Sequence, residues 1–144
     1  MNPLVPPRDN SQLKVLVSGA SGYLASHVVY LLLEKGYKVR GTVRSLSDTK
    51  KINHLATIHP SAQQNLELVE TDLLKPSSWD TAMTGIDFVL HVASPLPSGM
   101  VSDENLLIKP AVEGTETVFN AALKNKVKKI VITSSMVAIF TGQP

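Results

Sequence analysis

Short apolar runs alternate with amphipathic stretches along the chain from residue 13 onward. The runs are rich in Val, Ile and Leu and predict buried β-strands at residues 13–19, 37–45, 65–72, 86–94 and 128–135. Between them, apolar residues at helical spacing predict helices at 22–36, 47–59, 76–85 and 104–125. Strands that are apolar nearly throughout are typical of a parallel sheet with helices on both faces.

The first predicted helix has one apolar face and a defined end. Leu24, Val28, Leu31 and Leu32 fall on the same side of a helical projection, and we expect this side to be buried. Gly36 is a natural helix-ending glycine.

Other local signals mark the later helices and the tail. Ser47 is a candidate N-cap for the second helix, and Pro76 stands near the start of the third. Pro110 must either start or kink the fourth helix. The tail "MVAIF" (136–140) is uncharged and prone to form β-structure.

The alternation predicts the α/β class and a Rossmann-type doubly wound parallel sheet with strand order 3-2-1-4-5. Right-handed crossovers give this arrangement, and such sheets bind ligands at the carboxyl ends of their strands. Residues 1–12, with three prolines in the first seven positions, predict a disordered lead. The remainder, 13–144, is predicted to be a single nucleotide-binding domain.

The stretch "VSGASGYLAS" (17–26) lies between the first strand and the first helix. Gly19 permits a tight turn, Gly22 lets backbone approach a pyrophosphate at the helix N-terminus, and Ala25 lets the helix pack close to the strand. The spacing G-x-x-G-x-x-A is one residue longer than the dinucleotide fingerprint, and no Lys-Ser or Lys-Thr follows as in an ATPase P-loop. A glycine turn that only packs helix on strand is the alternative.

The end of the second strand bears on cofactor choice. "VRGTVRS" offers Arg40 and Arg44 and no acidic residue before Asp48, and Lys51 follows one turn into the next helix. An acid there would bind the ribose hydroxyls of NAD, whereas an arginine accommodates the 2′-phosphate of NADP. The pattern therefore favours NADP, with a pair of solvated basic side chains as the alternative.

Composition excludes several classes of function. The net charge of +2 is spread without a basic block, which predicts no nucleic-acid binding. The lack of cysteine excludes disulfides and thiolate metal sites, and the four histidines show no metal spacing, so we expect no metal. Apolar runs of about six residues are too short to span a membrane, and the N-terminus lacks a signal-peptide core, which predicts a cytoplasmic protein.

Six segments together resemble a known family. "VSGASGYLASHVV", "YKVRGTVRS", "TDL", "LHVASP", "IKPAVEGT" and "IVITSS" occur in order between about Lys14 and Phe140. They resemble the N-terminal part of extended short-chain dehydrogenases/reductases, in particular the dihydroflavonol reductase-like group. This group also holds cinnamoyl-CoA reductases and yeast-type methylglyoxal and ketone reductases. Two departures are mild: Ser18 stands where Thr is frequent, and Ala25 where a third glycine often stands.

The resemblance implies an NADP site made from several short segments. Its expected residues are Gly19, Ala20, Ser21, Gly22, Tyr23 and Leu24 at the pyrophosphate, Arg44 and Lys51 at the 2′-phosphate, Asp72 and Leu73 at the adenine, Val92, Ala93 and Ser94 along the ribose and diphosphate, and Thr133 and Ser134 by the nicotinamide ribose. Ser135 matches the catalytic serine that hydrogen-bonds the substrate carbonyl. Asp72 as a helix cap, Ser94 as a turn residue before Pro95, and Ser135 as a strand-end hydroxyl are the alternatives.

The implied activity is reduction of a small-molecule ketone or aldehyde to an alcohol by hydride transfer from NADPH. The family uses a Tyr as proton donor and a Lys four residues later, but Tyr23, Tyr30 and Tyr37 are followed there by His, Glu and Gly. We therefore expect a chain truncated after the fifth strand, an incomplete domain that is inactive alone and self-associates through that strand. A non-catalytic nucleotide-binding module, an inert fragment and an epimerase/dehydratase relative are the other hypotheses.

Overall fold

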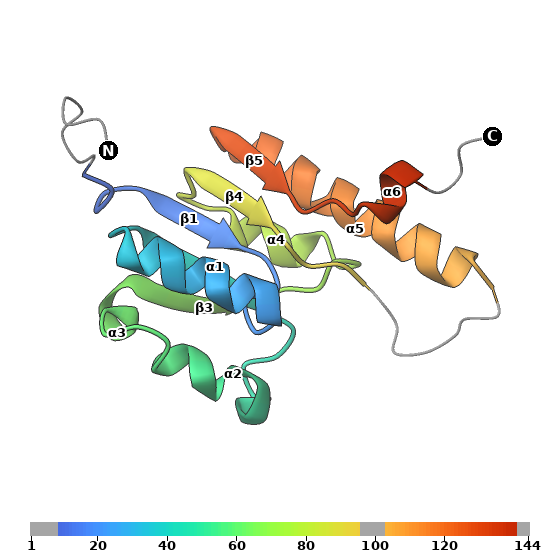
Figure 1. The fold of residues 1–144 in the computed structure, drawn as a ribbon. Helices are drawn as coiled ribbons and strands as arrows, with labels where there is room; N and C mark the ends of the chain where they lie inside the picture. Colours follow the sequence, from blue (N-terminus) through green and yellow to red (C-terminus); the bar gives the residue numbers. More distant parts are fainter. Residues whose placement is uncertain (1–8, 96–102, 141–144) are drawn as a thin grey trace.

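A parallel β-sheet forms the centre of the molecule (Figure 1). The computed structural model describes residues 9–95 and 103–140, so residues 1–8 of the predicted lead lie outside the described residues. In this part of the chain the strand order is β3-β2-β1-β4-β5, with every pair parallel, which confirms the predicted topology. The strands are β1 (Lys14–Val17), β2 (Lys38–Val43), β3 (Leu66–Glu70), β4 (Phe88–His91) and β5 (Lys129–Ile132).

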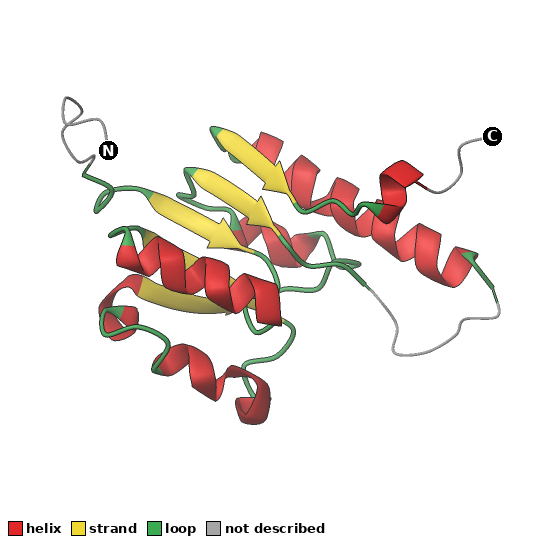
Figure 2. Ribbon diagram, viewed as in Figure 1, coloured by secondary structure: helices red, strands yellow, loops and turns green. Residues whose placement is uncertain are grey.

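Helices cover both faces of the sheet (Figure 2). They are α1 (Tyr23–Glu34), α2 (Thr49–Ala56), α3 (Ala62–Asn65), α4 (Ser77–Ala82), α5 (Asn105–Lys124) and α6 (Val137–Phe140). Buried residues of α1, α2 and α3 form one apolar cluster with Val17, Val39 and Val43. Buried residues of α4 and α5 form another with Leu16 and Val89, because neighbouring strand residues point to opposite faces.

The buried face of α1 differs from the predicted one. Ala25, Val29 and Leu33 are buried, whereas Leu24 and Leu31 are about half exposed. The small side chain of Ala25 lets α1 pack closely against the sheet. Ala25, Val29 and Leu33, spaced four apart, therefore face the sheet. The end of the helix was predicted correctly, because Gly36 adopts a φ of +79° and its amide bonds back to the carbonyl of Leu33.

One predicted helix detail was wrong. Asp48, not Ser47, precedes the first residue of α2, and the hydroxyl of Ser47 instead pairs with that of Ser45 at 2.8 Å. Of the two alternatives for Pro110, the structure excludes the start of a helix, because Pro110 lies inside α5. Pro76 immediately precedes α4, as expected.

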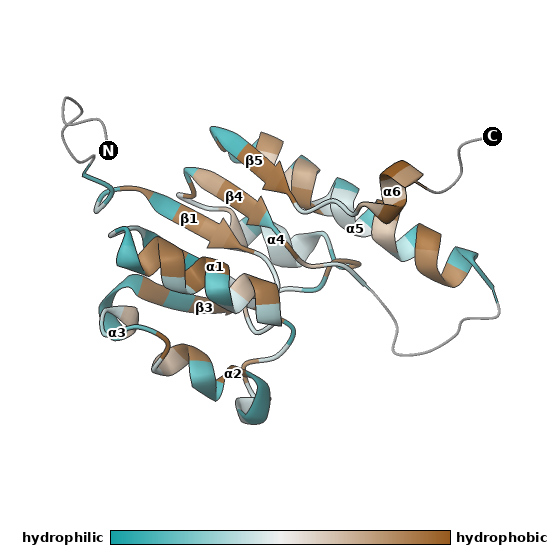
Figure 3. Ribbon diagram, viewed as in Figure 1, coloured by the Kyte–Doolittle hydropathy of each residue, from teal (hydrophilic) through white to brown (hydrophobic). Residues whose placement is uncertain are grey.

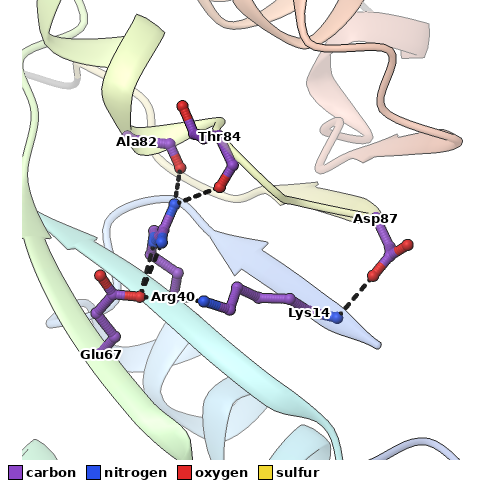
Figure 4. Close-up of polar contacts among 6 residues, drawn as sticks. All are labelled: Lys14, Arg40, Glu67, Ala82, Thr84 and Asp87. Atoms are coloured by element: carbon purple, nitrogen blue, oxygen red, sulfur yellow. Dashed lines mark hydrogen bonds and ion pairs between the residues drawn. The ribbon is translucent and has the colours of Figure 1, made fainter. Parts of the chain in front are cut away.

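The side chain of Arg40 is buried between β2 and α4, in contrast to both sequence-based interpretations of it (Figure 4). Its Nη1 donates hydrogen bonds to the carbonyl oxygens of Ala82 and Thr84 at 2.8 and 2.9 Å. Its Nε donates to Glu67, the residue beside it on β3, at 2.9 Å. Arg40 therefore satisfies carbonyls at the end of α4 and does not face the carboxyl ends of the strands.

The acidic residue Glu67 stays ionised beside this arginine. Desolvation by itself would raise the pKa of Glu67, but the hydrogen bond and charge of Arg40, helped by Lys14, outweigh it and hold the pKa below its usual range.

Asp87 links the starts of β1 and β5 through its carboxylate. It accepts hydrogen bonds from the Lys14 amide at 2.9 Å and from Nζ of Lys128 at 2.7 Å.

The tail after β5 is helical rather than extended. The Ser135 hydroxyl accepts a hydrogen bond from the amide of Val137 at 3.2 Å, and its carbonyl accepts one from Ala138, which starts the turn of α6. Much of β5 and α6 is hydrophobic (Figure 3). Several of their apolar side chains are exposed, among them Val131, Ile139 and Phe140.

Replacing Arg40 by Met should lower the free energy of unfolding by about 2–3 kcal/mol, since carbonyls of Ala82 and Thr84 lose a charged donor. Urea unfolding followed by circular dichroism measures this change. The matched variant Arg44→Met removes an exposed arginine from the same strand region and should change stability by less than about 0.5 kcal/mol. Equal losses in the two variants would contradict the structural role of Arg40.

The chain should self-associate at micromolar concentration through β5, an edge of the sheet in the described residues, and its exposed apolar neighbours. Sedimentation velocity should show species larger than a monomer, and the double variant Val131→Lys/Phe140→Ser should reduce them. Leu46→Lys is the control, because Leu46 bonds to Glu70 on the opposite edge strand and should leave association unchanged. A stable monomer of the unmutated chain would show that the edge is protected.

Candidate functional site

A cleft of about 840 Å³ opens at the carboxyl ends of β1, β2, β3 and β4. It lies where the predicted topology expects a ligand, beside the point at which the chain order of the strands reverses. Most of the predicted cofactor residues line it: Gly19, Ser21, Gly22, Tyr23, Leu24, Arg44, Lys51, Asp72, Leu73, Val92, Ala93 and Ser94.

The glycine turn after β1 forms one wall of the cleft. Gly19 has a φ of +66°, and a Cβ there would lie 3.1 Å from Cβ of Ala93 at the end of β4. The Gly19 amide donates to Oγ1 of Thr42 at 3.2 Å, and the next amide donates to the Thr42 carbonyl at 2.8 Å. The turn is therefore held between β2 and β4, and a side chain at residue 19 would be strained.

The N-terminus of α1 opens into the same cleft. Gly22 is the capping residue, and in the described structure no side chain caps this end of the helix. A Cβ on Gly22 would lie 3.3 Å from the Gly19 carbonyl oxygen, so a small residue keeps this approach open. The first-turn amides cannot bond within the helix and carry its positive dipole end, which suits an anion.

Two exposed cations follow β2, Arg44 directly after the strand and Lys51 in the first turn of α2. Arg44 and Lys51 line the cleft, and Nζ of Lys51 lies 3.0 Å from a carboxylate oxygen of Asp48. The loop between them is fixed where the Leu46 amide donates to Glu70 at 2.6 Å. The two basic residues that were predicted to bind the 2′-phosphate therefore line the same cleft.

A buried tryptophan positions the loop after β3. Nε1 of Trp79 donates to the carbonyl of Asp72 at 2.8 Å, and the Trp79 side chain is almost fully buried. The Asp72 carboxylate accepts the Leu74 amide at 2.9 Å, so it stabilises a local turn rather than capping α4. Asp72 still lies on the cleft wall with Leu73.

A buried serine and histidine join the ends of β1 and β4. Oγ of Ser18 lies 2.8 Å from Nδ1 of His91 and accepts the amides of Val92 and Ala93, each at 2.9 Å. Burial lowers the pKa of His91 below its ordinary value of about 6.5. These contacts give His91 a structural role at the ends of the two strands.

Four of the predicted site residues lie outside the large cleft. Thr133 lines a separate cavity of about 70 Å³ with His91 and Ser94. Ala20 is buried, and its Cβ would touch one built on Gly41. Ser134 and Ser135 are exposed and line neither cavity.

Sequence reasoning missed Thr42 and Trp79 as supports of the cleft, and noticed Ser18 only as a departure from the family pattern. Thr42 and Ser18 carried a usable signal, because each is a hydroxyl residue within or directly after a run that predicts a buried strand. Trp79 carried none, since its partner is a backbone carbonyl in another segment.

The described residues contain neither a metal-binding cluster nor a membrane-spanning helix. No group of three or more His, Asp or Glu side chains is placed to hold a metal ion among residues 9–95 and 103–140. No described helix is long and apolar enough to cross a bilayer.

Several curated proteins similar to this chain are plant reductases. The chain is 42% identical over 128 residues to dihydroflavonol 4-reductase of Gerbera hybrida, covering 88% of the chain and 35% of that protein. It is 45% identical over 126 residues to cinnamoyl-CoA reductase 2 of Arabidopsis thaliana, covering 88% of the chain and 36% of that protein. The chain thus spans little more than a third of the length of these two relatives.

Solved structures and a family comparison agree with this likeness. Gre2 of Candida albicans, solved in complex with NADPH, is 38% identical with a TM-score of 0.75, over 88% of this chain and 38% of that one. The NAD dependent epimerase/dehydratase family matches residues 15–143. With this match over nearly the whole described fold, the chain belongs to the NAD dependent epimerase/dehydratase family, in which it resembles the dihydroflavonol reductase-like members.

Proposed function

We propose that the cleft binds NADP and that the chain is the nucleotide-binding part of an NADP-dependent reductase of ketones or aldehydes. The observation behind the choice of NADP is the pair Arg44, directly after β2, and Lys51, in the first turn of α2, both on the cleft wall. Relatives that reduce carbonyl compounds support the activity, and the Gre2 relative was solved with NADPH.

The cleft fits a dinucleotide on its own features. Its volume of about 840 Å³ lies in the range of cofactor sites, and its glycines leave space that a Cβ would fill. Its cations lie at the end where an NAD site would place an acid on the ribose. Asp48 is the first acid after β2 along the chain, and it is paired with Lys51.

Each wall has a proposed role. The first-turn amides of α1 would receive the pyrophosphate, Arg44 and Lys51 the 2′-phosphate, and Asp72 with Leu73 the adenine. Val92, Ala93 and Ser94 would line the ribose and diphosphate, with Thr133 and Ser134 toward the nicotinamide ribose. A bound NADPH supplies the hydride.

Ser135 is the one residue of this chain that we assign to the carbonyl substrate. Its oxygen accepts the Val137 amide, a bond that does not use the hydroxyl proton. That proton is free to be donated to a carbonyl oxygen, and the local turn would fix its direction. Protonation of the product alkoxide requires a further acid, because a serine hydroxyl with no base beside it is a poor proton donor.

The chain should bind NADPH at least about tenfold more tightly than NADH, and Arg44→Ala should remove most of this difference. A lost charge-assisted hydrogen bond costs about 1.5–3 kcal/mol, which corresponds to about tenfold or more in affinity. Isothermal titration calorimetry measures both constants. Lys38→Ala, at the amino end of the same strand, is the charge-matched control and should keep the preference. Equal affinities of the unmutated chain for the two nucleotides would overturn the NADP assignment.

The 144-residue chain should not turn over carbonyl substrates at the rate of a full-length relative. A positioned general acid contributes about 10²–10⁴-fold, and none of the chain's tyrosines has a lysine four residues later. Oxidation of NADPH followed at 340 nm with a panel of aldehydes and ketones tests this. Steady turnover close to that of Gre2 would show that another group supplies the proton.

A further inference from the structure

Three groups contact the hydroxyl oxygen of Ser18, and only one of them can accept its proton. A serine hydroxyl has one proton to donate and two lone pairs to accept with. The amides of Val92 and Ala93 can only donate, and both lie 2.9 Å from Oγ. The remaining contact is Nδ1 of His91 at 2.8 Å, so the hydroxyl proton points to this nitrogen.

This geometry fixes the protonation state of His91. A nitrogen that accepts a proton from Ser18 carries none itself, so the imidazole must be neutral with its hydrogen on Nε2. Burial acts in the same direction, because it lowers the pKa of His91. The small cavity beside the ring contains no charged side chain among its lining residues, which are Leu73, Ala93, Ser94, Pro95, Ala111, Thr115, Ile132 and Thr133.

The same serine orients one wall of the cleft. The two amides that it binds belong to the segment after β4, where Ala93 lies against the Gly19 turn. The His91 carbonyl accepts a hydrogen bond from the amide of Thr133 at 3.0 Å, so His91 also positions the segment after β5. Ser18 and His91 touch no part of the large cleft themselves.

We propose that Ser18 and His91 are positioning residues for the nucleotide, and that protonation of His91 weakens nucleotide binding by releasing the wall at Val92 and Ala93. Protonation would place a hydrogen on Nδ1 facing the hydroxyl. Ser18 would then meet three donors with two lone pairs, and one of its bonds would break. This inference rests on the proposed nucleotide-binding function.

The direction of the pH dependence follows from the depressed pKa of His91 in the fold. The neutral pair contributes its full stabilisation above about pH 6.5, the ordinary histidine value. The contribution is lost as the pH falls from there through the lower pKa of the folded state. Nucleotide affinity depends on the folded chain alone, so it should fall only as the pH reaches the lowered pKa of His91.

Nitrogen chemical shifts of ¹⁵N-histidine-labelled chain test the pair without any nucleotide. At pH 7.5, His91 should show an unprotonated Nδ1 and a protonated Nε2, and it should titrate below the ordinary histidine pKa of about 6.5. A proton on Nδ1 at pH 7.5, or titration of His91 at or above the ordinary value of about 6.5, would overturn the proposed pair. This measurement needs only the unmutated chain.

Titrations with NAD⁺ between pH 7.5 and 5 test the effect on binding, because NAD⁺ lacks the 2′-phosphate, which itself titrates near pH 6. Affinity should fall about tenfold in step with His91. Ser18→Ala should bind about tenfold more weakly at pH 7.5 and lose the pH dependence, whereas Ser18→Thr, which keeps the hydroxyl, should restore both. An identical pH profile in Ser18→Ala would overturn the positioning role.

The two proposals fail in different ways. If the unmutated chain binds neither NAD⁺ nor NADP⁺ at pH 7.5, the proposed function fails and the positioning role fails with it, while the nitrogen shifts still decide the hydrogen-bonded pair. If Ser18→Ala does not fold, the pH profile of the unmutated chain decides, since a flat profile across the titration of His91 contradicts the proposal.

Discussion

The close approach of the β1 turn to the end of β4 is the constraint that shapes the cleft. A Cβ on Gly19 would stand 3.1 Å from that of Ala93, so the two segments touch through backbone and one methyl group. Ser18 and Thr42, on either side of this contact, hold it with hydroxyl groups that bond to backbone amides. The turn after β1 is therefore fixed from both sides. The uncapped N-terminus of α1 and the loop after β2 lie beside this turn.

The cleft carries no net excess of positive charge, so its charged side chains act on a ligand only at short range. Two basic residues, Arg44 and Lys51, and two acidic residues, Asp48 and Asp72, line the cleft. The Asp72 carboxylate is engaged by a backbone amide, and Asp48 lies against Lys51. Selectivity between nucleotides would then come from where Arg44 stands, since exposed charges are strongly screened over longer distances.

Most of the architecture could be predicted from the sequence, because strand order and the place of the cleft follow from the alternation of apolar runs and one glycine-rich turn. The role of Arg40 could not. Its position in "VRGTVRS" resembles that of Arg44, and only the register with Glu67 and the nearby end of α4 turn it into a buried structural cation. The face of α1 was also missed, because several apolar lines compete on that helix and close packing at Ala25 selects among them. Residues assigned to catalysis and to the nicotinamide end, such as Ser135, stay predictions.

The bond between Ser18 and His91 joins residues that are 73 positions apart in the chain. A ribosome adds about 5–20 residues each second, so roughly 4–15 s separate the synthesis of these two partners. During that interval the central strand β1 can pair with β2 once β2 has been made, but it has no β4 beside it, and its glycine turn has no opposite wall. The nascent chain must therefore keep an apolar strand edge soluble until its far partner emerges, and any nucleotide can be captured only after that late closure.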